Sequence, residues 1–352
     1  MIQHLNFLNT TVRFDVAADA LPAFTPVQHF FRHLLHDDPA GEPTFRIEIR
    51  AYYPDIDVEP AVWSAEQQVI RRSNAAEFNF DAHVVDEGDR RRYINRATLL
   101  DTPRDARQDN RFELAITGAS TVQVLDLVRD LVIRNEESLG TVVLHASGVC
   151  DDDGNALAIA GPKGAGKTTT LLSALRQPGW SYFTGDKLFC QLVEGGVEVY
   201  PWRDYPYVGV GTILADDKLA TLVRDSADPQ VDHRPPTDKI LLDPDTFESW
   251  LGSEFSAAPK RLAAFLLPEV RPGEPLRTWR LTDTNERWAQ LNKIIDKQAD
   301  TTFFTWQSYL VPDYANFYAT LSRLPGHIAG TPMIRLRGTL DVDPSALLEG
   351  GA

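Results

Sequence analysis

The chain has 352 residues, of which 50 are acidic and 35 are basic, so its formal net charge is −15 at pH 7. This charge opposes binding to a bare nucleic acid or an anionic membrane, because like charges repel and no counterions are released. No run of about 18 apolar residues occurs, so we expect no membrane-spanning helix.

Two cysteines, Cys150 and Cys190, are too few and too far apart for a disulfide framework or a thiolate zinc site. We expect buried free thiols. The first residues lack a cationic stretch followed by an apolar run, which a secretory leader would have. We therefore expect a cytoplasmic protein.

Alternating apolar and polar residues dominate the first third of the chain. The pattern predicts strands at 11–16, 45–53 and 111–118, with a short helix at 27–35. We interpret residues 1–118 as a β-rich amino-terminal domain.

From Ser120 the apolar residues recur at helical spacing, which predicts the helix that opens a second domain, 119–352. A hairpin of 142–149 and 156–161 follows, then a helix at 168–176 and a strand at 181–189. Later segments predict helices at 215–225 and 286–298 and strands at 239–243 and 333–338. The fold class is α/β.

The segment GPKGAGKT matches the phosphate-binding pattern G-x-x-x-x-G-K-[ST] and lies between a predicted strand and a predicted helix. Its glycines permit positive φ, so that backbone N–H groups can surround an anion at the helix start. Lys167 would contact the β- and γ-phosphates of ATP or GTP, and Thr168 would bind Mg²⁺. The predicted nucleotide-binding residues are Gly161, Pro162, Lys163, Gly164, Ala165, Gly166, Lys167, Thr168 and Thr169.

Phosphoryl transfer also needs a carboxylate near the metal, and Asp186 follows a predicted strand. It comes only 19 residues after Lys167 (186 − 167), whereas common NTPases place this acid after a further strand–helix unit. The order of strands in the sheet should therefore differ from theirs.

The order LHASGV, hairpin, GPKGAGKT, helix and FTGDKLF resembles the HPr kinase/phosphorylase family, which shares a nucleotide fold with phosphoenolpyruvate carboxykinase. The similarity covers roughly residues 120–215. It implies that His145 is the family's histidine before the loop, and that Thr168 and Asp186 hold the metal. Where the family has two adjacent acids this chain has Gly185 and Asp186. Because the first acid is absent, the resemblance does not identify the residue that takes the proton of the acceptor hydroxyl.

The resemblance implies an ATP-dependent kinase that acts on a hydroxyl, with His145 as base or positioning residue. The family's carboxy-terminal phosphorolysis signature is absent, so HPr is not the expected acceptor. A Ser or Thr hydroxyl of a peptide or protein is the leading acceptor. The alternatives are a small-molecule kinase and a nucleotide-gated binding protein without transfer activity. Family members often form homo-oligomers, although no interface signature is visible.

Cations outside the loop should stabilise the transferred phosphoryl group. We predict this role for Arg203, with Lys239, Lys260 and Arg261 as further candidates; a surface charge is the alternative for each. The arginine-rich stretch 89–93 could bind an acidic peptide or a phosphate, or could pair with neighbouring acids on a strand. Trp202, Tyr205 and Tyr207 could stack on a nucleotide base or grip a peptide, or could pack beneath their loop. Glu136 and Glu137 could approach the site, but we expect a solvated helix end there.

Overall fold

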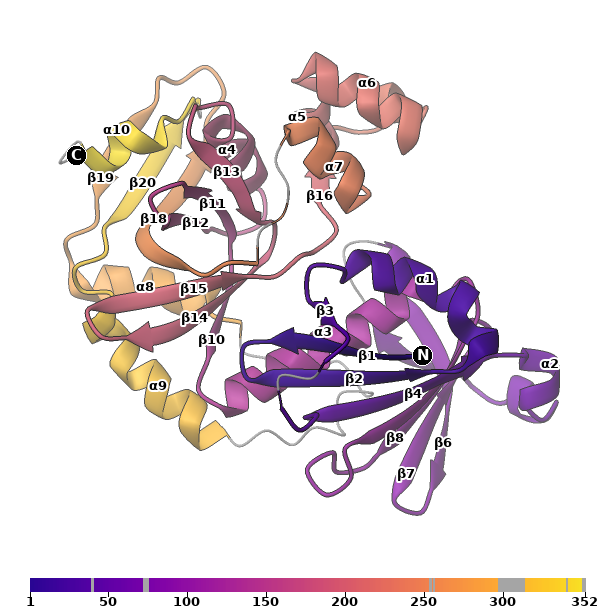
Figure 1. The fold of residues 1–352 in the computed structure, drawn as a ribbon. Helices are drawn as coiled ribbons and strands as arrows, with labels where there is room; N and C mark the ends of the chain where they lie inside the picture. The colour runs from indigo at the N-terminus through magenta and orange to yellow at the C-terminus, as the bar shows by residue number, and fades with distance from the viewer. Residues whose placement is uncertain are drawn as a thin grey trace. The chain divides into compact units, whose positions relative to one another are not determined.

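The computed structural model describes residues 1–38, 41–71, 76–252, 255, 257–296, 314–339 and 341–349. The chain is a mixed α/β protein with two nine-stranded sheets and a separate two-stranded one (Figure 1). It forms two compact units. Unit 1 comprises Met1–Leu139 with Lys297–Phe317, and unit 2 comprises Gly140–Asp296 with Tyr318–Ala352.

Unit 1 contains an open nine-stranded sheet. The strand order is β3-β1-β2-β4-β9-β8-β7-β6-β5, and only the β2–β4 and β4–β9 pairs are parallel. Its strands are β1 Ile2–Phe7, β2 Thr10–Val16, β3 Leu35–His36, β4 Phe45–Ala51, β5 Gln68–Arg71, β6 Phe80–Glu87, β7 Arg90–Ile94, β8 Thr98–Pro103 and β9 Arg111–Ile116. Its helices are α1 Leu21–Phe30, α2 Pro54–Asp57 and α3 Thr121–Ser138.

Strand alternation explains the two faces of this sheet. Phe14, Ile47 and Phe112 are fully buried, and α1 and α3 pack against each other and on this part of the unit. Arg46 and Glu113 are adjacent in sequence to Ile47 and Phe112. They point to the opposite face, because successive side chains alternate along a strand. The helix α3, predicted from the sequence to open the second domain, thus contributes to unit 1.

Unit 2 contains the loop GPKGAGKT. Its strands are β10 Val142–His145, β11 Ser147–Asp151, β12 Asn155–Ile159, β13 Trp180–Thr184, β14 Lys187–Val193, β15 Gly196–Pro201, β16 Tyr207–Gly209, β17 Lys239–Leu241, β18 Lys260–Val270, β19 Arg277–Arg280 and β20 Met333–Gly338. Its helices are α4 Lys167–Ala174, α5 Val210–Leu214, α6 Asp217–Ser226, α7 Pro244–Leu251, α8 Thr284–Ile294 and α10 Pro344–Glu349. Helix α9 Tyr314–His327 leads back into this unit.

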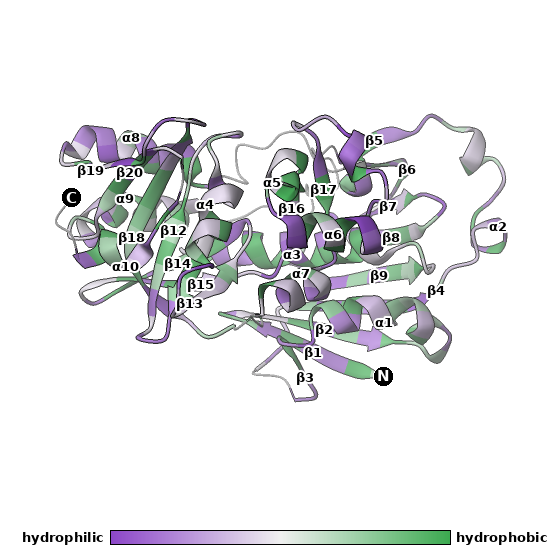
Figure 2. Cartoon of the chain, turned by 90° about the horizontal axis from the view of Figure 1, so that it is seen from above, coloured by the Kyte–Doolittle hydropathy of each residue, from purple (hydrophilic) through white to green (hydrophobic). Residues whose placement is uncertain are grey.

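The large sheet of unit 2 has the order β10-β14-β15-β18-β12-β11-β13, and β20 and β19 extend it from β18. β12, β18 and β20 run parallel, and the other pairs are antiparallel. The central strands are coloured as hydrophobic in Figure 2, in agreement with their burial. A strand that is covered on both faces needs apolar residues throughout, as Leu157, Ala158 and Ile159 of β12 provide.

Two predicted strands are in fact broken. Residues 142–149 form β10 and β11, separated at Ala146, and only β11 makes the hairpin with β12. Residues 181–189 form β13 and β14, separated by Gly185 and Asp186. In both cases apolar residues lie on either side of the break, so periodicity alone did not show that one strand ends and another begins there.

Other predicted elements differ mainly at their ends. The amino-terminal helix begins at Leu21 instead of Val27, and α8 ends at Ile294; the last two residues of its predicted range lie outside the described residues. Cys150 and Cys190 are free and buried, as expected. Within the described ranges no helix is both long enough and apolar enough to cross a membrane.

Candidate nucleotide site

The strand register of unit 2 brings three distant segments to one edge of its sheet. Ile159, at the end of β12, pairs with Ser147 of β11, and the loop 161–168 follows directly. The Ser147 hydroxyl donates to the Gly185 carbonyl (2.6 Å), and the Ala146 N–H donates to the Asp186 carbonyl (3.0 Å). The breaks in the two strand runs therefore lie opposite each other, beside the start of the loop.

The loop has the backbone that an anion-binding turn requires. Gly164 and Gly166 have φ of 82° and 103°, and Gly166 is the N-cap of α4. Gly161 does not have positive φ, contrary to expectation. Its lack of a side chain is needed for space, because a Cβ there would lie 3.1 Å from that of Ala165. The Lys167 ammonium donates to the Gly161 carbonyl (2.8 Å), so it lies across the two ends of the loop.

Three consecutive threonines begin α4, and their hydroxyls are used differently. The Thr170 hydroxyl donates to the Gly166 carbonyl, and the Thr169 hydroxyl is 3.4 Å from that of Thr212 in α5. The half-buried Thr168 hydroxyl makes no hydrogen bond to a residue that the structure describes. It is thus the one that can bind a ligand without giving up an internal contact.

Asp186 lies between a histidine and a lysine. His145 Nε2 is 3.4 Å from Asp186 Oδ1, and Lys187 Nζ is 3.8 Å from Asp186 Oδ2. Lys187 is also ion-paired with Asp296, whose N–H donates to the Val143 carbonyl (2.7 Å). The side chains of His145 and Asp186 are about half exposed, at 48% and 41%, which leaves both accessible to solvent.

The pKa of His145 is lowered from its ordinary value of 6.5. Asp186 is the largest single influence and acts to raise it, but partial burial and the positive charges of Lys187 and Lys167 together outweigh that carboxylate. The imidazole is therefore neutral at physiological pH and can accept a proton.

Lysine charges accumulate at this edge of the sheet. Burial lowers the pKa of Lys167 and of Lys239, and Asp186 partly offsets the shift in both. Lys239 further lowers the pKa of Lys167, and Lys163 lowers that of Lys239, so these ammonium groups are within electrostatic reach of one another. Lysines repelling each other in this way are stabilised by a bound polyanion.

Gly185 stands where the resemblance would place a first acid. A Cβ at this position would lie 2.8 Å from the Tyr182 hydroxyl, which is closer than van der Waals contact allows. Tyr182 is buried, and its pKa is raised by burial and further by the charges of Asp204 and Glu248. A protonated tyrosine hydroxyl thus occupies the space that a side chain at 185 would need.

The predicted cations are found in different places. Arg203 is buried, and its guanidinium donates to Glu248 (2.9 and 3.1 Å) and Asp245 (2.5 Å) of α7. Lys260 and Arg261 are at the opposite edge of the sheet, since Arg261 pairs with Asn155 at the start of β12. Of the four candidates, Lys239 is the one coupled to Asp186; its ammonium also lies 4.9 Å from the centroid of the Tyr207 ring.

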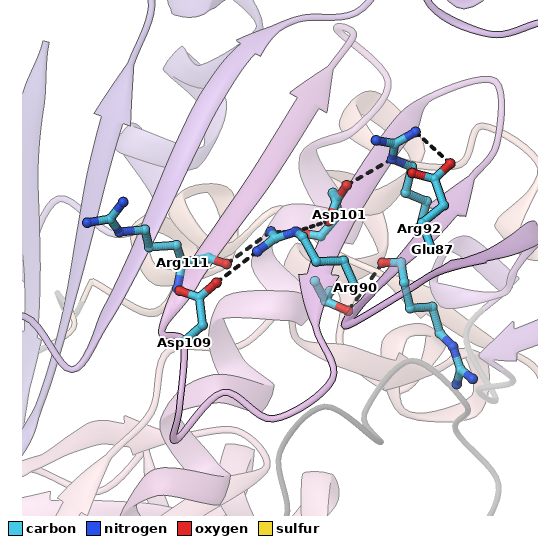
Figure 3. A network of polar contacts seen from close by, with 8 residues as sticks. Glu87, Arg90, Arg92, Asp101, Asp109 and Arg111 are labelled. Carbon is cyan, nitrogen blue, oxygen red and sulfur yellow. Dashed lines mark hydrogen bonds and ion pairs between the residues drawn. The ribbon is translucent and has the colours of Figure 1, made fainter.

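The arginine-rich stretch of unit 1 is paired with acids, which confirms the second of its two interpretations. Arg90 binds Asp101 and Asp109, and Arg92 binds Asp101 and Glu87 (Figure 3). These contacts link β7, β8 and the start of β9 across one face of the sheet.

Two further expectations are resolved by burial. Trp202 is 1% exposed and packs against Phe189, as a packing residue would. The prediction of a solvated helix end at Glu136 and Glu137 was wrong, because both are buried. Glu136 accepts hydrogen bonds from Asn9 and Thr10, which join α3 to the β1–β2 turn.

Sequence reasoning missed Lys187 and Asp296 at the site. Lys187 adjoins Asp186 in sequence, and that adjacency could have suggested it. Asp296 lies 110 residues from Asp186 (296 − 186), and nothing in its local sequence indicates the contact with Lys187.

No group of three or more His, Cys, Asp or Glu side chains suited to a metal occurs in the described part of the chain. A nucleotide-bound Mg²⁺ does not require one, because phosphate oxygens and water supply most of its ligands. No protein-family model matches the chain, and a comparison with curated proteins gives no match.

Proposed function

We propose that the protein is an ATP-dependent kinase of the HPr-kinase-like type that phosphorylates a Ser or Thr hydroxyl of a peptide or protein. The observation that supports this proposal is the convergence of a glycine-rich loop, a helix N-terminus, Asp186 and His145 at one edge of the sheet. A positively charged loop facing a carboxylate and a base is the combination that phosphoryl transfer needs.

Lys167 and the backbone N–H groups of 161–168 would orient the β- and γ-phosphates. The acceptor oxygen would attack the γ-phosphorus while the bond to the β-phosphate oxygen breaks, and ADP would leave. His145 Nε2 would take the acceptor's proton. We assign the neutralising cation to Lys239 in place of Arg203, whose charge is already engaged by two carboxylates.

The residues present fit a magnesium ion. The Thr168 hydroxyl is not engaged by a described residue, and the half-exposed Asp186 is close enough to the neighbouring Lys167 to raise its pKa. These two side chains would hold Mg²⁺, which would neutralise charge on the β- and γ-phosphates. GTP would fit the same phosphate contacts.

A peptide acceptor is favoured over a metabolite by the strand that precedes Gly185. In the sheet order of the described residues β13 is a terminal strand, and it leads directly into Asp186. An extended peptide can pair with such an edge and bring a hydroxyl to the site.

A degenerate peptide library with fixed Ser, Thr or Tyr tests this proposal. We would incubate it with Mg²⁺ and ATP labelled at the γ-phosphate and follow transfer of the label. Label on Ser or Thr peptides that disappears with Asp186→Asn supports the kinase. ATP binding without label on any peptide, protein extract or metabolite mixture would reject transfer activity.

The second candidate is a nucleotide-gated binding protein without transfer activity. Gly185 and the Tyr182 hydroxyl favour it, because the space of the family's first acid is filled. In that case ATP should change the hydrogen exchange of the segments around Asp186 while ADP formation stays at the buffer rate.

A further inference from the structure

A polar cavity lies in unit 2, at the amino ends of β12 and β18. Its volume is about 890 Å³. Asn155 and Arg261 contribute from the two strands, the turn 195–196 from the β14–β15 hairpin, and Ser322, Arg323 and His327 from α9. The nucleotide loop follows the carboxyl end of β12, so this cavity is at the other end of the same strand.

The charge of this cavity is opposite to that of the chain. The described residues that line it include Arg261, Arg323 and His327 but no Asp or Glu, although acids outnumber bases by 15 overall (50 − 35). Neither Arg261 nor Arg323 makes an ion pair or a side-chain hydrogen bond with a described residue. Other exposed arginines of unit 2, such as Arg224 and Arg337, are paired with acids.

His327 is oriented so that one ring nitrogen remains available. Its Nδ1 is 3.1 Å from the Val193 carbonyl and 3.2 Å from the Gly196 carbonyl. Carbonyls only accept, so Nδ1 carries the proton and donates to them. Nε2 is then left for a ligand, as an acceptor when the ring is neutral and as a donor when it is charged.

Three glycines of the cavity wall are bordered by open space. No heavy atom lies within 4 Å of where a Cβ would stand at Gly195, Gly326 or Gly330, all of which line it. The Thr331 side chain adds a hydroxyl to the wall, whereas the Ser322 hydroxyl already donates to the Ala319 carbonyl (2.8 Å). Room, a hydroxyl and two uncompensated guanidinium groups suit a small ligand with at least two anionic groups, because guanidinium binds phosphate and carboxylate in a bidentate manner.

We propose that this cavity binds a small polyanionic metabolite bearing phosphate or carboxylate groups, independently of the nucleotide loop. Arg261 and Arg323 supply the charge, and His327 and the Thr331 hydroxyl supply directional hydrogen bonds. The inference does not depend on kinase activity, since it involves none of the residues of the nucleotide site.

Calorimetric titration of the full-length protein tests the site. Lys167→Ala would be the background in every sample, to weaken anion binding at the nucleotide loop. Pyrophosphate and citrate, titrated separately in low-salt buffer without Mg²⁺, distinguish phosphate from carboxylate ligands. We expect Arg261→Gln with Arg323→Gln to raise the Kd of the probe that binds at least tenfold.

The matched control is Arg224→Gln with Arg337→Gln, which removes the same charge from paired arginines and should change Kd less than twofold. Thermal unfolding of each variant checks that it is folded. Equal weakening by both pairs of substitutions would overturn the site, since it would report net charge only. Failure of both probes to bind the background protein would overturn it as well.

Discussion

Two groups of charged residues in this molecule, one in each unit, are arranged in opposite ways. On the exposed sheet face of unit 1, Arg90 and Arg92 share Asp101 and bind further acids, so nearly every positive charge has a partner (Figure 3). At the loop edge of unit 2, lysines gather around Asp186 and repel one another, which with burial lowers the pKa of Lys167 and Lys239.

The comparison shows that the density of basic residues does not mark a binding site. The arginine-rich stretch 89–93 is the densest run of positive charge in the sequence, yet its ion pairs satisfy it internally. The lysines of unit 2 are scattered along the chain and come together only in the fold. Uncompensated positive charge favours binding of an anion, because part of the repulsion between like charges is then relieved.

The largest effect should come from Arg203, whose charge is compensated inside unit 2. Arg203→Met would leave Glu248 buried without a partner, so we expect a loss of about 3–5 kcal/mol in the free energy of unfolding. Arg92→Met, which removes a side chain 41% exposed, should cost about 1 kcal/mol or less. Urea denaturation followed by tryptophan fluorescence measures both.

Adding Glu248→Leu to Arg203→Met should restore much of the stability, since both buried charges are then absent. Equal losses for the Arg203 and Arg92 variants would contradict the contrast between buried and exposed pairs. A normal unfolding curve with abolished phosphoryl transfer in Arg203→Met would instead return Arg203 to the catalytic role predicted from sequence.

The second-largest effect should come from removing an uncompensated positive charge from the loop 161–168. Lys167→Ala should weaken ATP binding or slow phosphoryl transfer by about 100-fold, since one preorganised contact to developing charge is typically worth that much. Lys218→Ala, on α6, removes the same charge and serves as control. Titration with a fluorescent ATP analogue measures binding, and an effect of similar size in both variants would argue against the loop as the site.

Gly185→Ala should destabilise unit 2 by about 1–3 kcal/mol, because the added methyl group meets the Tyr182 hydroxyl at 2.8 Å. Tyr182→Phe in the same chain removes the obstructing oxygen. In a double-mutant cycle of urea denaturation the two changes should cost less together than the sum of the single costs. Strict additivity would show that the hydroxyl does not exclude a side chain at 185.

The smallest effect is on the titration of His145. Its pKa should lie below 6.5 and should fall further in Asp186→Asn, because the carboxylate favours the charged ring. The proton-accepting form, and with it kcat/KM, should therefore be lost as the pH falls through this pKa. NMR titration of the imidazole signals measures it, with Asp152→Asn as the control; an increase in the Asp186 variant would disprove the assigned interaction.

The sequence by itself determined the features that depend on neighbouring residues. The loop 161–168, the helix after it and most strands follow from local spacing and from glycine's access to positive φ, as Gly164 and Gly166 confirm. Ion pairing of the arginine-rich stretch with acids was one of two interpretations that the sequence left open. It could be foreseen because β7 and the acids that it contacts are close in sequence. The kinase activity and its acceptor remain predictions from a resemblance.

Tertiary structure alone decided which charges are compensated. Arg203 meets Glu248 across 45 residues, and Lys187 meets Asp296 across 109. Local patterns specify the faces of helices and strands, but not which distant side chains the packed strands bring within a few ångströms. The electrostatic energy of a charged group depends on those distances and on its burial. Whether its charge is compensated is therefore determined only when the chain has folded.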